Sequence, residues 1–255
     1  MHLPDGIVSS PAILVGAALV SAGVVSASVT RVAKSDRAQQ LAWTGTLAAF
    51  ALAVQAVNVP AAPGVSAHAL GASLLTLLLG PASAVLALAT VVLLQALLFA
   101  DGGVAALGIN VLNIVVIPVA AVTLVRGLFA RLPNGLRWTA ILGTTLGNVV
   151  AGSALAAILV FKAGAPAAWT IGTLVGIQAL AGVVEGLLTA GAVAKIRQRA
   201  PRLLAASAPG ARSAASRNVW AWAAVCVGIA VIAASFASSA PDALELVLSR
   251  AHAAP

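Results

Sequence analysis

The feature that most constrains this chain is a series of long apolar runs, each close to the ~20 residues with which a helix crosses a bilayer. The runs lie at about 11–30, 41–58, 82–100, 104–125, 138–161, 168–194 and 219–238. They are continuous rather than alternating at every second residue, which excludes a membrane β-barrel. Only 8% of the residues are charged, whereas a soluble domain carries about 25%. We therefore expect an all-α, multi-pass integral protein of the cell membrane.

Basic residues decide whether a shorter apolar stretch at 66–79 also crosses the membrane. If it crosses, three basic clusters with 12 of the 14 Lys and Arg residues fall on one side, as the positive-inside rule requires. If it does not, the first cluster lies opposite the other two. The clusters are Arg31, Lys34 and Arg37; Arg126, Arg131 and Arg137; and Lys195, Arg197, Arg199, Arg202, Arg212 and Arg217. The stretch is therefore predicted to span, as a short helix that His68 begins on the outer side.

This topology gives eight transmembrane helices, with both termini on the extracytoplasmic side. We expect a seven-helix core at 1–199, a cytoplasmic linker at 200–217, and one further helix with an outer tail at 218–255. The net charge of +8 is then a topology signal, and no nucleic-acid partner is implied. The single cysteine, Cys226, excludes a disulfide framework.

The amino terminus carries a candidate metal chelate. The Met1 amine and the His2 amide nitrogen can close a five-membered ring on a metal ion, and the amide with His2 Nδ1 a six-membered one. Three nearly coplanar nitrogens suit Ni(II), Cu(II) or Co(II). Met1 is expected to be retained, because a bulky second residue blocks its removal. The alternative is that a histidine at position 2 is incidental. Likewise, His68 is either a fourth nitrogen ligand or an interfacial histidine bonded to a carbonyl.

Other polar residues at membrane depth are costly and therefore informative. Asp5 and Asp101 could orient metal ligands, as carboxylates do beside metal-bound histidines. Asn110 could support the same site, whereas Asn113 is expected to bond between helices. Glu185 could dock a coupling partner or pair within the bundle. The chain has no phosphate-binding loop and no GxSxG or HExxH pattern, so we expect neither an enzyme nor an ATP site.

Several motifs together resemble the CbiM/NikM family, the substrate-specific components of energy-coupling factor transporters for cobalt and nickel. The similarity covers about residues 1–200. A later Pro-Asp-Ala-Leu-Glu, at 241–245, looks like the PDGLE element of the small accessory component, with Ala243 in place of glycine. The core motifs are Met-His-Leu-Pro-Asp-Gly at 1–6, Ser-Ala-His at 66–68, Leu-Gly-Pro at 79–81, Gln-Ala-Leu-Leu-Phe at 95–99, Asp-Gly-Gly at 101–103, Leu-Gly-Ile-Asn-Val-Leu-Asn at 107–113 and Val-Glu-Gly-Leu-Leu-Thr at 184–189.

The resemblance implies a metal held by the Met1 amine, the His2 amide and imidazole, and His68. It also implies a transmembrane coupling subunit and two cytoplasmic ATPase subunits, with Co²⁺ or Ni²⁺ as transported substrate. The seven-helix core would then be a bundle of the substrate-component type. A stand-alone secondary permease for a small polar solute, or a membrane scaffold with an incidental His2, are the alternatives.

Overall fold

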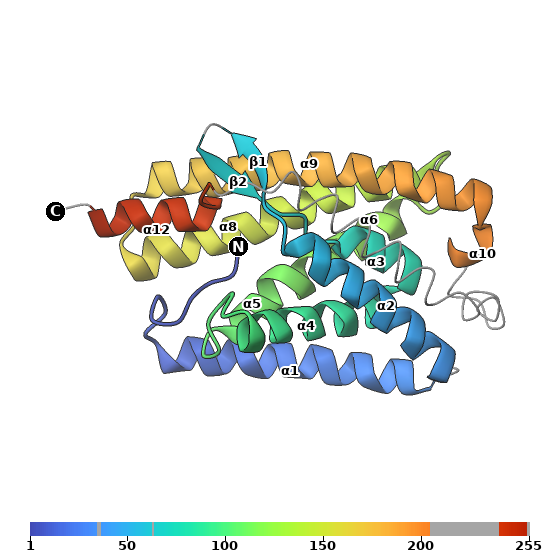
Figure 1. The fold of residues 1–255 in the computed structure, drawn as a ribbon, viewed down its shortest axis with the longest axis horizontal. Helices are drawn as coiled ribbons and strands as arrows, with labels where there is room; N and C mark the ends of the chain where they lie inside the picture. The colour runs from blue at the N-terminus through green and yellow to red at the C-terminus, as the bar shows by residue number, and fades with distance from the viewer. Residues whose placement is uncertain (35–36, 63, 205–239, 254–255) are drawn as a thin grey trace.

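The computed structural model describes residues 1–34, 37–62, 64–204 and 240–253, and its arrangement is a helical bundle with one small hairpin (Figure 1). The helices and strands are α1 (Pro11–Ala33), α2 (Arg37–Gln55), β1 (Val59–Ala62), β2 (Val65–Ala67), α3 (Ala72–Leu79), α4 (Pro81–Leu98), α5 (Leu107–Val111), the π-helix η1 (Leu112–Val116), α6 (Ile117–Phe129), α7 (Gly135–Trp138), the π-helix η2 (Thr139–Gly143), α8 (Thr144–Ala163), α9 (Ala167–Arg199), α10 (Pro201–Leu204) and α12 (Ala243–Ala253).

The predicted membrane character is confirmed. In the described ranges, five helical stretches are long and apolar enough to cross a bilayer: Pro11–Ala33, Pro81–Leu98, Leu107–Phe129, Gly135–Lys162 and Ala167–Arg199. Each matches a predicted run. The apolar part of α2, Leu41–Gln55, is shorter than these, and the predicted span at 219–238 lies outside the described residues. The count of seven helices plus one therefore stays a prediction.

The stretch at 66–79 differs from its prediction. His68 does not begin a helix: it follows β2 and precedes the first residue of α3 by four positions. The delay has a physical cause, since Gly71 takes φ +74°, a left-handed conformation that a helix excludes and glycine tolerates. Seven of the eight residues of α3 are buried, as expected of a short helix inside the bundle. The hairpin β1–β2, which pairs antiparallel, was not expected.

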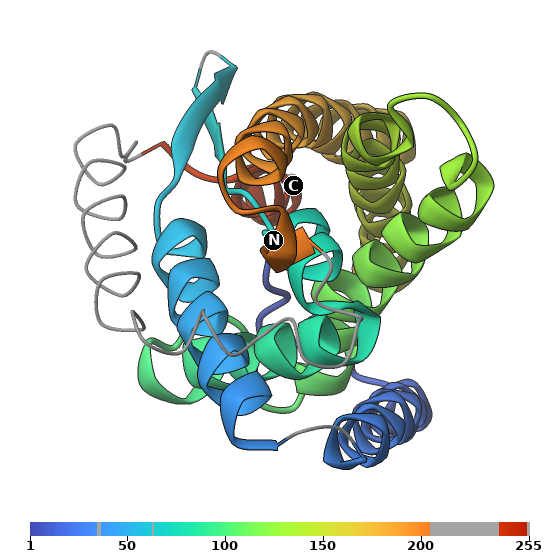
Figure 2. The same ribbon diagram turned by 90° about the vertical axis from the view of Figure 1, so that its right-hand side faces the viewer.

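The two ends of the bundle differ in charge. The N-terminus, the hairpin and α12 lie toward the left end in Figure 1, while the C-terminal end of α1, the start of α2 and α10 lie at the right. Basic residues stand in the last turns of α1, α6, α7 and α9, at Arg31, Arg126, Arg137, Arg197 and Arg199. Figure 2 looks onto that right-hand end. These members of the predicted basic clusters thus lie at the end remote from Met1, whereas Arg212 and Arg217 lie outside the described residues.

Candidate metal centre

The first residues of the chain are threaded into the bundle and held by α5. Leu3 is fully buried, and its backbone N–H donates to Asn110 Oδ1 at 2.8 Å. Asn110 Nδ2 in turn donates to the Leu3 carbonyl at 3.0 Å, and Gly103 N–H donates to the same carbonyl at 2.9 Å. Asn110 therefore satisfies both backbone groups of Leu3 as a neighbouring strand would. Its supporting role at a metal site stays a prediction.

Asp5 was expected to orient a histidine, but its described hydrogen bonds go to the backbone of the loop between α4 and α5. Its carboxylate accepts hydrogen bonds from the N–H groups of Val104, at 3.1 Å, and Ala106, at 3.0 Å. The loop lies so close to the terminus that a Cβ on Gly103 would overlap Asp5, and one on Gly102 would lie 3.0 Å from His2 Cβ. The Asp-Gly-Gly motif therefore serves a close approach of two backbones.

The Met1 amino group lies between two side chains from distant parts of the sequence. Its nitrogen is 3.2 Å from His68 Nε2 and 2.5 Å from Asp242 Oδ2. His68 Nδ1 is 3.4 Å from the Ala69 carbonyl oxygen, which can only accept. The hydrogen of a neutral His68 therefore sits on Nδ1, and the Nε2 lone pair faces Met1. That tautomer is the one a metal ion needs at Nε2.

His2 reaches the same place from the other side. Its ring stacks on that of His68, with centroids 5.6 Å apart and planes inclined by 12°. His2 Nε2 is 3.1 Å from Gln95 Oε1, which leaves Nδ1 as the nitrogen for the predicted chelate. In this structure Nδ1 contacts Asp101 Oδ1 at 3.1 Å. The Asp101 carboxylate therefore occupies the position from which a metal ion would bind Nδ1.

The acidic groups around the amine are held ionised. The hydrogen bond from His2 lowers the pKa of the Asp101 carboxyl below its usual range. Burial alone would raise the pKa of Asp242, but the charge and hydrogen bond of the Met1 ammonium outweigh it and bring that pKa to about 2. At neutral pH the metal-free centre thus holds two carboxylates close to the amine and the two imidazoles.

Asp242 reaches the amine because the C-terminal segment docks on β2. Ser66 N–H donates to the Pro241 carbonyl at 2.9 Å, and Ser66 Oγ to that of Ala240 at 2.7 Å. Asp242 also begins α12: its Oδ1 accepts from the Glu245 N–H, and Glu245 Oε2 accepts from the Asp242 N–H. This reciprocal pair is a capping box. Ala243 is the first helical residue, so alanine in place of glycine there fits the local structure.

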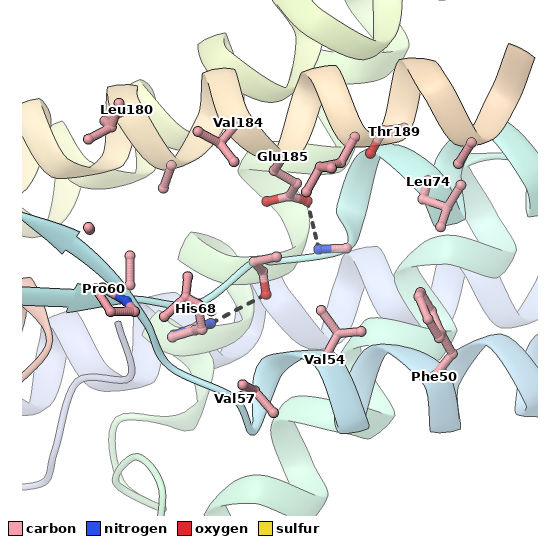
Figure 3. A pocket seen from close by; sticks show the side chains of 18 residues that line it. Phe50, Val54, Val57, Pro60, His68, Leu74, Leu180, Val184, Glu185 and Thr189 are labelled. Atoms are coloured by element: carbon pink, nitrogen blue, oxygen red, sulfur yellow. Dashed lines mark hydrogen bonds between the residues drawn. The ribbon is translucent and has the colours of Figure 1, made fainter. Parts of the chain in front are cut away.

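Glu185 does not lie at the centre but touches the chain next to it. Its carboxylate accepts from the N–H groups of Leu70 and Gly71. Figure 3 shows Glu185 and His68 in the wall of a cavity. The cavity has a volume of about 500 Å³ and is lined mainly by apolar side chains of α2, the β1–β2 hairpin and α9. Of the two roles expected for Glu185, pairing within the bundle is the one that the contacts match.

One sequence prediction for a polar residue is wrong. Asn113 was expected to bond between helices, yet neither of its side-chain polar atoms has a hydrogen-bond partner in the described part of the chain. The glycines of α9 differ in their packing. A Cβ on Gly182 or Gly186 would lie within 3 Å of the neighbouring helix, so this pair allows close helix packing. Gly172 and Gly176, at the same spacing, have no described heavy atom that such a Cβ would meet within 4 Å.

Two residues of the centre were missed. Gln95 and Asp242 were not predicted to be site residues, and Asp242 was placed in the region of the outer tail. Both stand inside quoted motifs, which is the signal that pointed to them. Within the described ranges, no group of three or more His, Cys, Asp or Glu side chains is arranged to hold a metal ion. A metal centre here depends on the terminal amine and backbone of Met1 and His2.

Comparison with known proteins gives a family and several relatives. Residues 2–203 match the family model described as the cobalt uptake substrate-specific transmembrane region. The fused nickel transport protein NikMN of Rhodobacter capsulatus is 33% identical over 246 residues, covering 88% of this chain and 69% of that protein. The probable fused nickel transport protein LarMN of Lactiplantibacillus plantarum is 34% identical over 247 residues, covering 91% and 73%. The cobalt transport protein CbiM 1 of Pelobacter propionicus is 30% identical over 200 residues, covering 74% and 87%.

Solved structures agree. The crystal structure of a truncated transition metal transporter superimposes with a TM-score of 0.70 and 29% sequence identity, over 78% of this chain and 99% of that one. A second structure of a transition metal transporter gives a TM-score of 0.70 at 28% identity. The two fused nickel relatives cover more of this chain than the family model does, so their similarity extends beyond residue 203.

Proposed function

Because this chain belongs to the CbiM family of cobalt uptake substrate-specific transmembrane regions, with a fused C-terminal segment, we propose that it is the metal-capture subunit of a nickel or cobalt uptake system. Its cargo, Ni²⁺ or Co²⁺, binds at the amino terminus. The Met1 amine, the deprotonated His2 amide, His2 Nδ1 and His68 Nε2 form the ligand set. Four nitrogens in a plane suit both ions, which accept tetragonal nitrogen coordination.

One observation carries this proposal: the terminal amino group of Met1 lies 3.2 Å from His68 Nε2, with the His2 ring stacked alongside. Nitrogens that coordinate adjacent positions of one metal ion lie about 3 Å apart, given metal–nitrogen bonds of ~2 Å. His68, contributed by the segment between β2 and α3, already stands next to the N-terminal chelate. A turn of the His2 ring away from Asp101 would free its Nδ1 for the same ion.

When the ion binds, the nitrogen ligands lose protons and their contacts with carboxylates are replaced by bonds to the ion. The Met1 ammonium must lose a proton to coordinate, and Asp242 must release it; Asp101 must likewise release His2 Nδ1. The carboxylate of Asp242 pairs with the Met1 ammonium before the ion binds. The His2 amide must also lose its proton, so the divalent ion is then offset by the amide anion and by the nearby carboxylates of Asp101 and Asp242.

The remaining steps belong to partners. We propose a transmembrane coupling subunit and two cytoplasmic ATPase subunits of the energy-coupling factor type, since uphill uptake needs an energy source. The metal centre then faces the extracytoplasmic side and the basic end of the bundle faces the cytoplasm, as the positive-inside rule requires.

Extending the chain by one residue ahead of Met1 tests the ligand set. The extension turns the Met1 amine into an amide and moves the terminal amine one residue further from His2. This alters the first chelate ring and removes the amine from its place beside His68 Nε2, so uptake of Ni²⁺ and Co²⁺ should be lost. The measurements are calorimetric binding by the purified protein and radiolabelled uptake of both ions in cells. An equal extension after Pro255 is the matched control, and His2→Ala and His68→Ala should weaken binding. Unchanged binding and uptake by the N-terminally extended protein would contradict the proposal.

A further inference from the structure

Both carboxylate oxygens of Glu185 accept hydrogen bonds from the backbone beside His68. Oε2 accepts the N–H of Leu70 at 3.0 Å, and Oε1 that of Gly71 at 2.8 Å. Two successive N–H groups that converge on one point form a small anion-binding concavity. Gly71, at φ +74°, makes the convergence possible. Glu185 comes from the middle of α9, so a spanning helix fixes a loop only two residues from His68 (Figure 3).

The same peptide is held from the opposite side. Gln55, the last residue of α2, donates from Nε2 to the Leu70 carbonyl at 2.7 Å. The N–H and C=O of Leu70 therefore each have a side-chain partner, from α9 and α2 respectively. Because 68–71 belongs to neither strand nor helix, these bonds replace the ladder that regular structure would supply.

Glu185 is itself fixed in place. Asn148 of α8 hydrogen-bonds to its carboxylate. On either side of it along α9, Gly182 and Gly186 allow the backbones to meet: a Cβ there would lie 2.9 Å from Thr145 Cα and 2.8 Å from Ile141 Cα. Glu185 is 7% exposed, and its helix, α9, packs against α8 and η2.

Packing alone does not fix the loop. His68, Ala69 and Gly71 line the cavity of about 500 Å³, so along that side the segment faces open volume rather than a close-packed wall. A loop beside a cavity can shift unless hydrogen bonds hold it. A shift of about 1 Å matters at a metal site, since ligand distances must hold within about 0.2 Å.

We propose that Glu185 is a positioning residue for metal capture: by holding the peptides of Leu70 and Gly71, it keeps His68 Nε2 within reach of the Met1 amine. The proposal rests on the proposed function, because it assigns Glu185 a role at the same centre. It predicts that loss of the carboxylate removes the fourth nitrogen ligand and leaves the Met1–His2 chelate intact.

The test counts nitrogen ligands on Cu²⁺ bound to the purified full-length protein, from the nitrogen splitting in its electron paramagnetic resonance spectrum. Wild type should show four nitrogens, and Glu185→Ala three, as His68→Ala should. Affinity for Ni²⁺ should fall by 10–100-fold in Glu185→Ala, the usual cost of losing an outer partner of a metal ligand. Gln178→Ala, a buried polar residue on the same helix, is the control and should keep four nitrogens.

The outcomes separate the two proposals. If wild type binds no metal with nitrogen ligands, the proposed function fails. If wild type shows four nitrogens and Glu185→Ala shows the same four at unchanged affinity, only the positioning role is overturned. Should the alanine variant not fold, Glu185→Gln decides. Its amide keeps one acceptor but turns an NH₂ group toward the other N–H, so wild-type affinity there would equally overturn the role.

Discussion

Replacing Asp242 by asparagine should loosen both ends of the chain together. The pKa of Asp242 falls from its ordinary value of 3.8 to about 2 through the Met1 ammonium, and the side chain is only 12% exposed. At about 1.36 kcal/mol for each pKa unit, the ion pair contributes roughly 2 kcal/mol at neutral pH. Asparagine retains the helix cap of α12 but carries no charge, so the variant isolates the ion pair from the cap.

The assay is hydrogen–deuterium exchange of residues 1–8 and 240–248 in the metal-free protein. At pH 7 both segments should exchange about 30-fold faster in Asp242→Asn than in wild type, since roughly 2 kcal/mol corresponds to that factor. Glu245→Gln, which alters only the capping box, should accelerate 240–248 far more than 1–8.

The pH dependence gives a second check on the same variant. A carboxyl group whose folded-state pKa is lowered stabilises fully above its ordinary pKa of 3.8, and the contribution disappears as pH falls through about 2. After correction for intrinsic exchange rates, wild type should therefore approach the variant at pH 2.5. Equal exchange of the two proteins at pH 7, or a difference that persists undiminished at pH 2.5, would refute the assignment of the stabilisation to this ion pair.

Three further substitutions test the loop and the ligands. Ala100 adopts φ +53°, where a Cβ costs about 1–2 kcal/mol, so Ala100→Gly should raise thermal stability by about 1 kcal/mol in detergent. Gly103→Ala would force a Cβ onto Asp5 and should abolish Ni²⁺ binding in calorimetry, whereas Gly127→Ala, which meets no described atom within 4 Å, should leave it unchanged. Gln95→Leu removes the acceptor at His2 Nε2 and should weaken Ni²⁺ binding 10–100-fold, while an unaltered dissociation constant would show that Gln95 does not orient the ring.

The long apolar helices were predictable because the local composition of a segment indicates whether it can cross the membrane. Each of the five spanning stretches coincides with an apolar run, and the lack of charge in such runs needs no tertiary information. The N-terminal ligands were also accessible, since a chelate of Met1 and His2 depends on neighbouring atoms only. His68 followed from its place among the motifs of a resembling family.

The contacts that complete the centre were not predictable, because they join residues far apart in the sequence. Asp242 lies 241 positions from Met1, and Glu185 lies 115 from Leu70. Nothing local distinguishes a carboxylate that receives an ammonium from one that caps a helix, and Asp242 does both. The start of α3 was missed because a single left-handed glycine, Gly71, delays it. Composition favours an apolar helix from the start of the 66–79 stretch, and one backbone angle overrides it.

The ion pair between Met1 and Asp242 can form only after the segment that carries Asp242 has been synthesised. Met1 and Asp242 lie 241 positions apart in the sequence, so the amine of Met1 is synthesised well before the carboxylate that pairs with it. During insertion the terminus can be held by His68 and later by Asn110, but the carboxylate arrives only after the described bundle through α10 has been made. A translation product that stops before Pro241 would contain the helical core, but the Met1 amine would lack the carboxylate of Asp242. Synthesis of the segment that carries Asp242 therefore completes the surroundings of Met1.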